Sequence, residues 1–231
     1  MAGNILLIET STALCSTALV VDGAIAEYRE SAEPRAHASM TAVFVKEMLD
    51  SRGMTAADCD AICVSKGPGS YTGLRVGVST AKGLCFGAKK PLMAIGTLDI
   101  LVAQAIDEGL VPEGCRFIVP MVDARRMEVY SAIFTPDGGQ LTETAPCIVD
   151  SSSFAEYLEQ GTVLFVGDGA AKCEPVLNHP NARFAQCNPK ASAMIRPALE
   201  AYNGKRFENT AYFEPFYLKQ FVATVSAKKL F

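Results

Sequence analysis

Tryptophan is absent from the 231-residue sequence, and only two histidines are present, His37 and His179. Because histidine is a common zinc ligand and the usual general base near neutral pH, this scarcity disfavours a metal hydrolase. No apolar run approaches the roughly 20 residues that span a bilayer. The start of the chain lacks a basic segment, and polar residues 9–12 interrupt the apolar stretch there, so no signal peptide is expected.

Eight cysteines are present, but none forms a C-x-x-C pair, and several lie in apolar runs as small interior residues do. Reduced thiols and a cytoplasmic location are therefore expected. Acidic residues outnumber basic ones, 25 to 21, and the net charge is −4. Since nucleic-acid-binding proteins usually present a basic face, independent binding of nucleic acid is not expected.

The two halves of the chain show the same order of predicted elements. In the first half, three strands precede a helix, a further strand, a glycine-rich loop and a second helix, at residues 4–10, 15–21, 24–30, 37–51, 60–65, 67–70 and 71–86. The second half repeats this order at residues 116–122, 127–134, 141–149, 151–159, 162–166, 167–169 and from 170 onward. The halves share no sequence period, so the repeat is one of elements alone.

This order predicts an α/β fold of two ribonuclease-H-like lobes with a cleft between them. It is similar to the duplicated architecture of actin, sugar kinases and Hsp70, a likeness that by itself implies no function. We expect the first lobe at residues 1–108, the second at 109–210, and a C-terminal tail at 211–231 that packs back on the body.

The most distinctive segment, at residues 66–77, reads K-G-P-G-S-Y-T-G-L-R-V-G and joins a predicted strand to a predicted helix. Glycines before a helix N-terminus let an anion approach the backbone. However, no Lys-Ser or Lys-Thr pair follows as in a P-loop, and Thr72 replaces the third glycine of the dinucleotide fingerprint. An anion site and a tight strand-to-helix turn both remain open.

Residues 67–77 closely resemble the G-P-G-S-F-T-G-L-R-I-G signature of the TsaB (YeaZ) family. Three further segments agree with that family: I-L-L-I-E-T-S-T at 5–12, R-A-H at 35–37, and V-D-A-R-R-M-E-V-Y at 122–130. The order of motifs matches along the whole chain. Two departures are Glu9, which replaces the usual aspartate, and Arg126-Met127, which replace a Met-Gly pair.

The resemblance implies an accessory subunit in the synthesis of threonylcarbamoyladenosine beside the anticodon of tRNAs. Its implied partners are a catalytic TsaD-like subunit, a TsaE-like ATPase and tRNA bound through the complex. Family members pair through two first-lobe helices, and the same surface can form a homodimer when the protein is alone.

Both of these predicted helices carry residues suited to an interface. The second has small side chains at four-residue spacing, which allow another helix to approach closely, and the first is rich in Met and Phe. The expected interface residues are Met40, Phe44, Met48, Gly73, Gly77, Ala81 and Cys85. The alternative is that the two helices pack inside one core.

The candidate chemistry is sparse. TsaD-type enzymes carry two metal-binding histidines after the second helix, where this chain has Thr97 and Leu101, so no catalytic residue and no metal site are expected. A small-molecule kinase or ATPase is the alternative, because Glu9 and Asp123 end equivalent strands. No glycine loop follows Asp123, so no tightly bound cofactor is expected. Binding of ATP or ADP is expected only in the assembled complex. The weak candidates for nucleotide contact are Glu9, Ser11, Asp123, Gly167 and Gly169.

Overall fold

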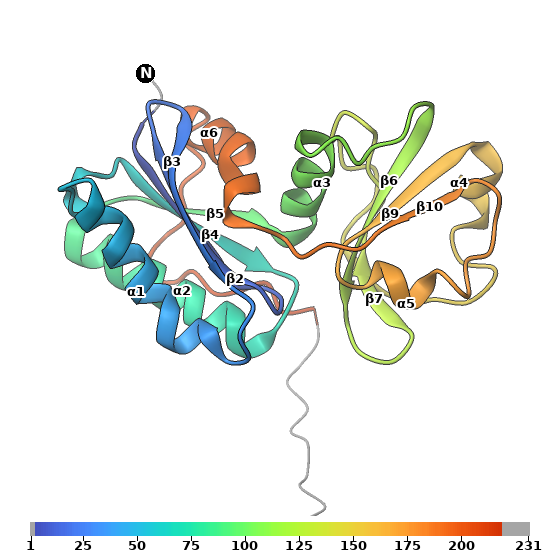
Figure 1. The fold of residues 1–231 in the computed structure, drawn as a ribbon, viewed down its shortest axis with the longest axis horizontal. Coiled ribbons are helices and arrows are strands. Elements are labelled where there is room, and N and C mark those ends of the chain that lie inside the picture. Colours follow the sequence, from blue (N-terminus) through green and yellow to red (C-terminus); the bar gives the residue numbers. More distant parts are fainter. Residues whose placement is uncertain (1–2, 219–231) are drawn as a thin grey trace, which may run out of the picture.

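A computed structural model describes residues 3–218, which form two α/β lobes side by side (Figure 1). The first lobe contains a five-stranded sheet in the order β3-β2-β1-β4-β5, in which β1 is antiparallel to β2 and parallel to β4. Helices α1 and α2 cover one face of this sheet. The elements are β1 (Ile5–Glu9), β2 (Cys15–Val21), β3 (Ala24–Ser31), α1 (Ala36–Ser51), β4 (Ala61–Gly67), α2 (Tyr71–Ala88) and β5 (Leu92–Gly96).

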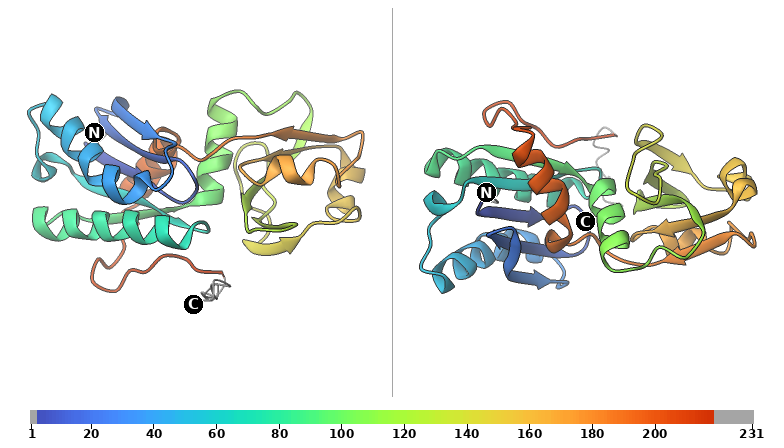
Figure 2. Two further views of the ribbon diagram at one scale, coloured as in Figure 1. Left: turned by 60° about the horizontal axis from the view of Figure 1, so that its bottom comes forward. Right: turned by 90° about the horizontal axis from the view of Figure 1, so that it is seen from above.

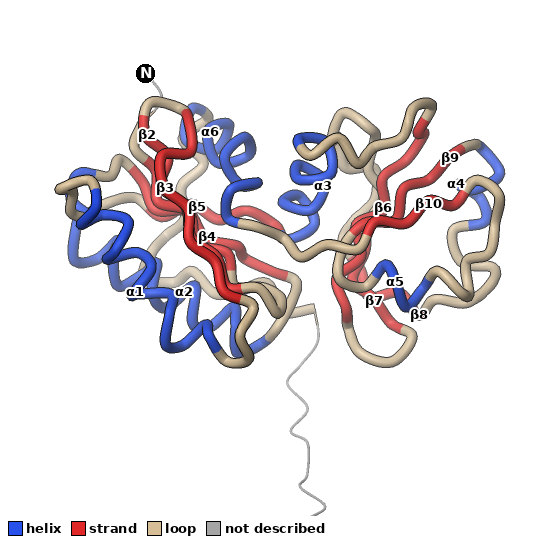
Figure 3. The backbone as a smooth tube through the Cα atoms, viewed as in Figure 1, coloured by secondary structure: helices blue, strands red, loops and turns tan. Residues whose placement is uncertain are grey.

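The second lobe repeats the plan with the sheet order β10-β9-β6-β7-β8 (Figure 3). This arrangement confirms the predicted fold of two lobes, although β7, β8 and α4 are shorter than the sequence suggested. The elements are β6 (Cys115–Asp123), β7 (Glu128–Ser131), β8 (Ala145–Ile148), α4 (Ala155–Gln160), β9 (Thr162–Val166), α5 (Ala170–Cys173) and β10 (Ala182–Ala185).

Strand β1 forms the centre of the first lobe because all five of its residues are buried. Successive side chains of a strand point to opposite faces. Leu6 and Ile8 therefore pack with Met48 of α1 and Val78 of α2. Ile5 and Leu7 pack on the opposite face, in a separate cluster.

The chain returns to the first lobe near its C-terminal end. The 3-10 helix η2 (Ala191–Met194) and helix α6 (Ile195–Asn203) pack against Ile5 and Leu7 (Figure 2). Helix α3 (Thr97–Asp107) lies between the lobes and buries Leu101 in a second-lobe cluster. The predicted second lobe at 109–210 is therefore wrong at its C-terminal end, because η2 and α6 pack on the first-lobe sheet, in the same cluster as Ile100 of α3.

Residues 208–217, here called the C-terminal strap, cross the first lobe. Glu208 N donates to Leu92 O at 2.8 Å, and Phe216 N donates to Lys66 O at 2.7 Å. Lys82 of α2 donates its Nζ to the carbonyls of Ala211 and Phe213, at 3.2 and 3.0 Å. The tail thus packs back on the body as far as it is described, and the rest of the expected tail, residues 219–231, lies outside the described residues.

Helix α2 begins after Ser70, whose Oγ accepts a hydrogen bond from Gly73 N at 3.2 Å, as an N-cap does. The first turns of the helix then pack closely against Thr10, the residue that follows β1. A Cβ on Gly73 would lie 2.1 Å from Thr10 O, and one on Gly77 would lie 2.2 Å from Thr10 Oγ1. These glycines are required by a close helix-to-strand contact inside the lobe.

All eight cysteines are free thiols. Within residues 3–218, no helix combines the length and the apolar character needed to cross a membrane.

The contact between α2 and β1 can be tested with two glycines of the same helix. Gly73→Ala should lower the free energy of unfolding by about 1–3 kcal/mol or more, because its Cβ meets a backbone oxygen that cannot move freely. Gly83→Ala is the matched control, since no atom lies within 4 Å of its Cβ position. It should be neutral or stabilise by up to about 1 kcal/mol through helix propensity. Urea unfolding of both variants measures the difference, and equal effects would contradict the contact.

Candidate functional site

The two equivalent first strands, β1 and β6, end beside one opening between the lobes. A cavity of ≈ 950 Å³ lies there, lined by the β1–β2 turn, the first residues of α1 and α2, and the β6–β7 turn. Its polar lining residues include Ser11, Thr12, Arg35, His37, Ser70, Thr72, Asp123, Arg125, Arg126, Glu128 and Asp168. We refer to this cavity as the strand-end cleft. Two of the five candidate nucleotide contacts, Ser11 and Asp123, lie in its wall.

Glu9, at the end of β1, is fully buried and does not line the strand-end cleft. Its Oε1 accepts a hydrogen bond from Ser11 N at 2.5 Å, and its Oε2 has no hydrogen-bond partner among residues 3–218. Burial raises the pKa of Glu9 to about 7, hydrogen bonding from Ser11 opposes this, and the charge of Asp168 adds to it. Glu9 is thus an interior carboxyl group that is largely protonated below neutral pH.

The second-lobe carboxylates hold the turn that follows β6. Asp123 Oδ1 accepts from Arg125 N at 2.6 Å and pairs with Lys172 Nζ at 2.7 Å. Asp168 Oδ1 accepts from Asp123 N at 3.0 Å, and burial raises the pKa of Asp168 to about 6. Asp123 and Asp168 therefore have partners within the lobe. Across the described part of the chain, no group of three or more His, Cys, Asp or Glu side chains is arranged to hold a metal.

The candidate glycines do not line the strand-end cleft, and the protein itself occupies the space beside them. A Cβ on Gly167 would lie 2.3 Å from Met121 O, and Gly169 N donates to that same oxygen at 2.9 Å. In the first lobe, a Cβ on Gly69 would lie 2.1 Å from Ser11 O. In each of these turns, a backbone carbonyl oxygen occupies the space beside the glycine Cα.

Both histidines serve local structure in separate lobes. His37 Nε2 lies 2.9 Å from Thr12 O and ties the start of α1 to the β1–β2 turn. His179 Nδ1 accepts from Asn181 N at 3.1 Å. Thr97 and Leu101, which occupy the positions of the TsaD-type histidines, are both fully buried in the interior. The described residues thus provide no histidine pair for a metal.

Six of the seven predicted interface residues are buried within the first lobe, which corrects the sequence interpretation for those six. Met48 and Ala81 are fully buried, and Phe44 and Cys85 are 7% and 2% exposed. Gly73 and Gly77 contact the end of β1, and Met40 packs half-buried against a cluster formed by Cys15, Ala36 and Phe44. Side chains enclosed within one lobe cannot contact a partner.

The solvent-facing side of the same helices carries different residues. Phe86 of α2 is 86% exposed and Val43 of α1 is 40% exposed. Ser79 and Gly83 are also exposed on α2, and a Cβ on Gly83 or Gly87 would meet no atom within 4 Å. We call Val43, Ser79, Gly83, Phe86 and Gly87 the outer helix face. The exposed aromatic at Phe86 and the glycines beside it were the available sequence signal for this face.

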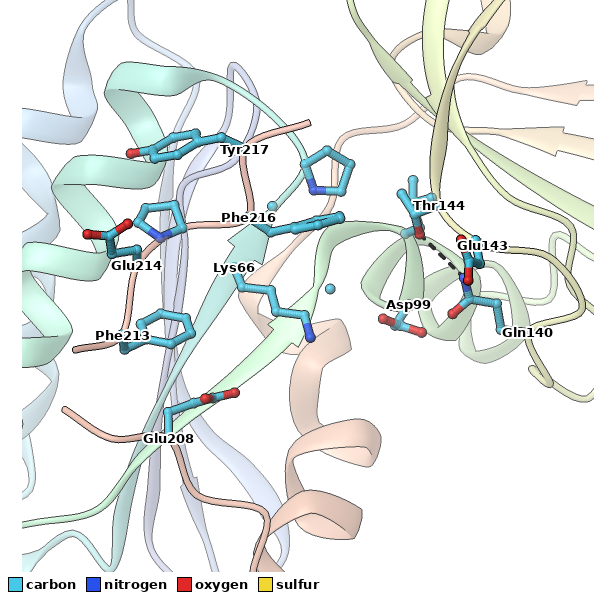
Figure 4. Close-up of a pocket in the computed structure, with 15 residues that line it drawn as sticks. Lys66, Asp99, Gln140, Glu143, Thr144, Glu208, Phe213, Glu214, Phe216 and Tyr217 are labelled. Carbon is cyan, nitrogen blue, oxygen red and sulfur yellow. Dashed lines mark hydrogen bonds between the residues drawn. The ribbon is translucent and has the colours of Figure 1, made fainter. Parts of the chain in front are cut away.

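A second cavity of ≈ 570 Å³ lies between the lobes beside the C-terminal strap (Figure 4). Its walls come from the ends of β4 and β5, the start of α3, a second-lobe loop and the strap. The lining residues include Lys66, Gly67, Gly96, Leu98, Asp99, Gln140, Glu143, Thr144, Glu208, Phe213 and Phe216. Sequence reasoning missed this cavity because its walls come from four separate stretches of the chain.

The buried carboxyl of Glu9 predicts a pH-dependent stability. Its pKa is raised from 4.5 to about 7 on folding, so its contribution to stability is fully present below about pH 4.5 and is lost as the pH rises through about 7. Glu9→Gln does not titrate and keeps an acceptor for Ser11 N. Relative to the parent, this variant should gain on the order of 3 kcal/mol between about pH 5 and about pH 8. Denaturant unfolding across this range measures the gain, and a difference that does not vary with pH would refute it.

Comparison with known proteins finds a TsaD family model and relatives named TsaB. Residues 30–223 match the family described as "TsaD: tRNA N6-adenosine threonylcarbamoyltransferase". The "tRNA threonylcarbamoyladenosine biosynthesis protein TsaB" of Escherichia coli K12 is 29% identical, with 95% of this chain and 96% of that protein covered. The Haemophilus influenzae protein of the same name is 30% identical, with 98% and 97% covered.

The solved structures agree with the sequence comparisons. "YeaZ from Pseudomonas aeruginosa" superposes with a TM-score of 0.81 at 26% identity, covering 93% of this chain and 99% of that one. A second Pseudomonas aeruginosa structure, of a protein with similarity to the peptidase YeaZ, gives 0.82 at 26% identity, covering 94% and 99%. The chain belongs to the TsaB (YeaZ) family.

Proposed function

We propose that the protein is a non-catalytic accessory subunit in the synthesis of threonylcarbamoyladenosine in tRNA. The observation that carries this proposal is similarity along nearly the whole chain to proteins named for threonylcarbamoyladenosine biosynthesis. In this role it holds a TsaD-type catalytic subunit in the cytoplasm. A TsaE-like ATPase and tRNA join through the complex.

The chemistry of the described residues supports an accessory role. The interior positions of Thr97 and Leu101 provide no metal ligands where the TsaD-type enzymes carry histidines. Asp123 is paired with Lys172, and Glu9 is sealed in the interior, so neither carboxylate is free to hold Mg²⁺ as a kinase would require. Backbone carbonyl groups occupy the space beside Gly69 and Gly167, which argues against a tightly bound nucleotide. We therefore expect ATP or ADP to bind only in the assembled complex.

The outer helix face is the proposed contact for the TsaD-type subunit. Helices α1 and α2 lie beside each other on one side of the first lobe (Figure 1), and Phe86 and Val43 expose apolar surface there. Gly83 and Gly87 leave room for a partner helix to approach closely. An exposed aromatic beside small residues is typical of an interface core. The same face would form the homodimer in the absence of the partner.

The purified chain should not catalyse tRNA modification. With tRNA and the activated threonylcarbamoyl donor, it should produce no modified adenosine, whereas adding the TsaD-type and TsaE-type subunits should produce it. Nucleoside analysis by mass spectrometry measures the product. Modification by the chain alone that persists through further purification would contradict the accessory role.

Two arginine substitutions, two residues apart on α2, separate the outer helix face from the core. Gly83→Arg should leave the melting temperature nearly unchanged, because its position is open to solvent. It should weaken binding to the TsaD-type subunit roughly 30- to 1,000-fold, or about 2–4 kcal/mol. Ala81→Arg should instead unfold or strongly destabilise the chain, because Ala81 is fully buried.

Gly83→Ala is the control, because it replaces the same glycine with a small side chain. It should retain most of the affinity for the TsaD-type subunit. Calorimetry of each variant with the TsaD-type subunit provides the measurement. Unchanged affinity in folded Gly83→Arg would exclude the outer helix face as the contact.

A further inference from the structure

The cavity beside the C-terminal strap lies at a favourable position in the fold. Strands β1, β4 and β5 are parallel, and the cavity opens at the carboxyl ends of β4 and β5, next to Gly67 and Gly96. Ligands of open α/β sheets bind outside the carboxyl ends of the strands. The volume of ≈ 570 Å³ also lies within the range of about 300–1,000 Å³ that small-molecule sites occupy.

Among the described residues that line this cavity, one is a cation. Lys66, near the end of β4, extends its ammonium group into the cavity (Figure 4). The side chain is half-buried. No ion pair or hydrogen bond of its Nζ occurs within residues 3–218, where the ion pairs involve other residues. The charge is thus partly removed from water without a partner.

Carboxylate side chains from other elements line the same cavity as this ammonium group. Asp99 lies in the first turn of α3, Glu143 comes from the second-lobe loop, and Glu208 comes from the strap. None of the three forms an ion pair with a described residue. Burial raises the pKa of Asp99, and the charge of Lys66 opposes this rise. Opposite charges therefore face one cavity across a gap that no described side chain fills.

Apart from Glu214 of the strap, the remaining lining residues are apolar or neutral. Leu98 of α3 and the rings of Phe213 and Phe216 from the strap supply apolar surface. Across the gap, Gln140 donates its Nε2 to Thr144 Oγ1 at 3.3 Å and to Thr142 O at 2.8 Å. The cavity thus combines apolar surface with a few polar groups, as small-molecule sites do.

We propose that this cavity binds a small zwitterion of the α-amino acid class, with its carboxylate on Lys66 and its ammonium group on Asp99. A simple anion would be repelled by Asp99, Glu143 and Glu208, and a simple cation would be repelled by Lys66. A zwitterion can pair with Lys66 through its carboxylate and with Asp99 through its ammonium group, and its side chain then contacts Phe216 and Leu98. Because both lobes and the strap form the walls, an occupant connects all three.

Calorimetric titration of the full chain with each of the L-amino acids tests the site. At least one should bind saturably. Two matched probes remove one charge at a time: the N-acetyl derivative lacks the ammonium group, and the methyl ester lacks the carboxylate. Each should bind at least about tenfold more weakly than the free amino acid.

Variants assign the binding to the cavity. Lys66→Met and Asp99→Asn should each reduce affinity by at least about tenfold. The controls Lys46→Met and Asp50→Asn alter an exposed ion pair on α1 and should bind like the parent. A thermal melt of each variant confirms folding, and Lys66→Met decides the matter if Asp99→Asn does not fold.

Two results would overturn the proposal. One is that no L-amino acid binds the parent, and the other is that the folded Lys66→Met variant binds as the parent does. The site is independent of the outer helix face, so Gly83→Arg should retain amino-acid binding while it loses the TsaD-type subunit. Failure of either proposal is thereby distinguishable from failure of the other.

Discussion

Helix α2 rests directly on the end of β1, and the positions of the other functional surfaces depend on this contact. Three glycines, Gly69, Gly73 and Gly77, leave no side chain between the helix and residues 10 and 11. The close approach fixes how α2 is turned about its axis. One side of the helix thereby encloses Ala81 and Cys85, and the other exposes Gly83 and Phe86. The floor of the strand-end cleft and the outer helix face are set by the same packing.

This contact also distinguishes the glycine-rich turn before α2 from a phosphate loop with an open backbone. Such a turn binds anions when its backbone N–H groups are open. In this chain, the carbonyl groups of Thr10 and Ser11 occupy the space that the glycines leave, and Ser70 N donates to Ser11 O at 2.6 Å. The second-lobe turn at Gly167 is filled in the same way by Met121 O. The charges of the strand-end cleft are also partly paired, whereas Lys66 and Asp99 in the other cavity form no ion pair within residues 3–218.

Much of the fold was predictable because local patterns determine it. The apolar run at 4–10, the predicted strand at 15–21 and the predicted helix at 71–86 each correspond to observed elements. The return of α6 to the first lobe was not predictable, because an amphipathic helix does not reveal which sheet it covers. The interface residues were assigned to the wrong side of α2, since small residues at four-residue spacing suit a strand end as well as a partner helix. The cavity around Lys66 depends on four distant segments that no local pattern connects.

The packing of α6 on β1 also orders the events of synthesis. The second-lobe elements from β6 to β10 form one uninterrupted stretch of chain, whereas the first lobe is built from both ends of the sequence. The face of β1 that carries Ile5 and Leu7 is not fully covered until η2 and α6 have left the ribosome. The lobe that is begun first is therefore the last to be completed, and a nascent chain shorter than about 200 residues presents an incomplete core to the chaperones of the cell.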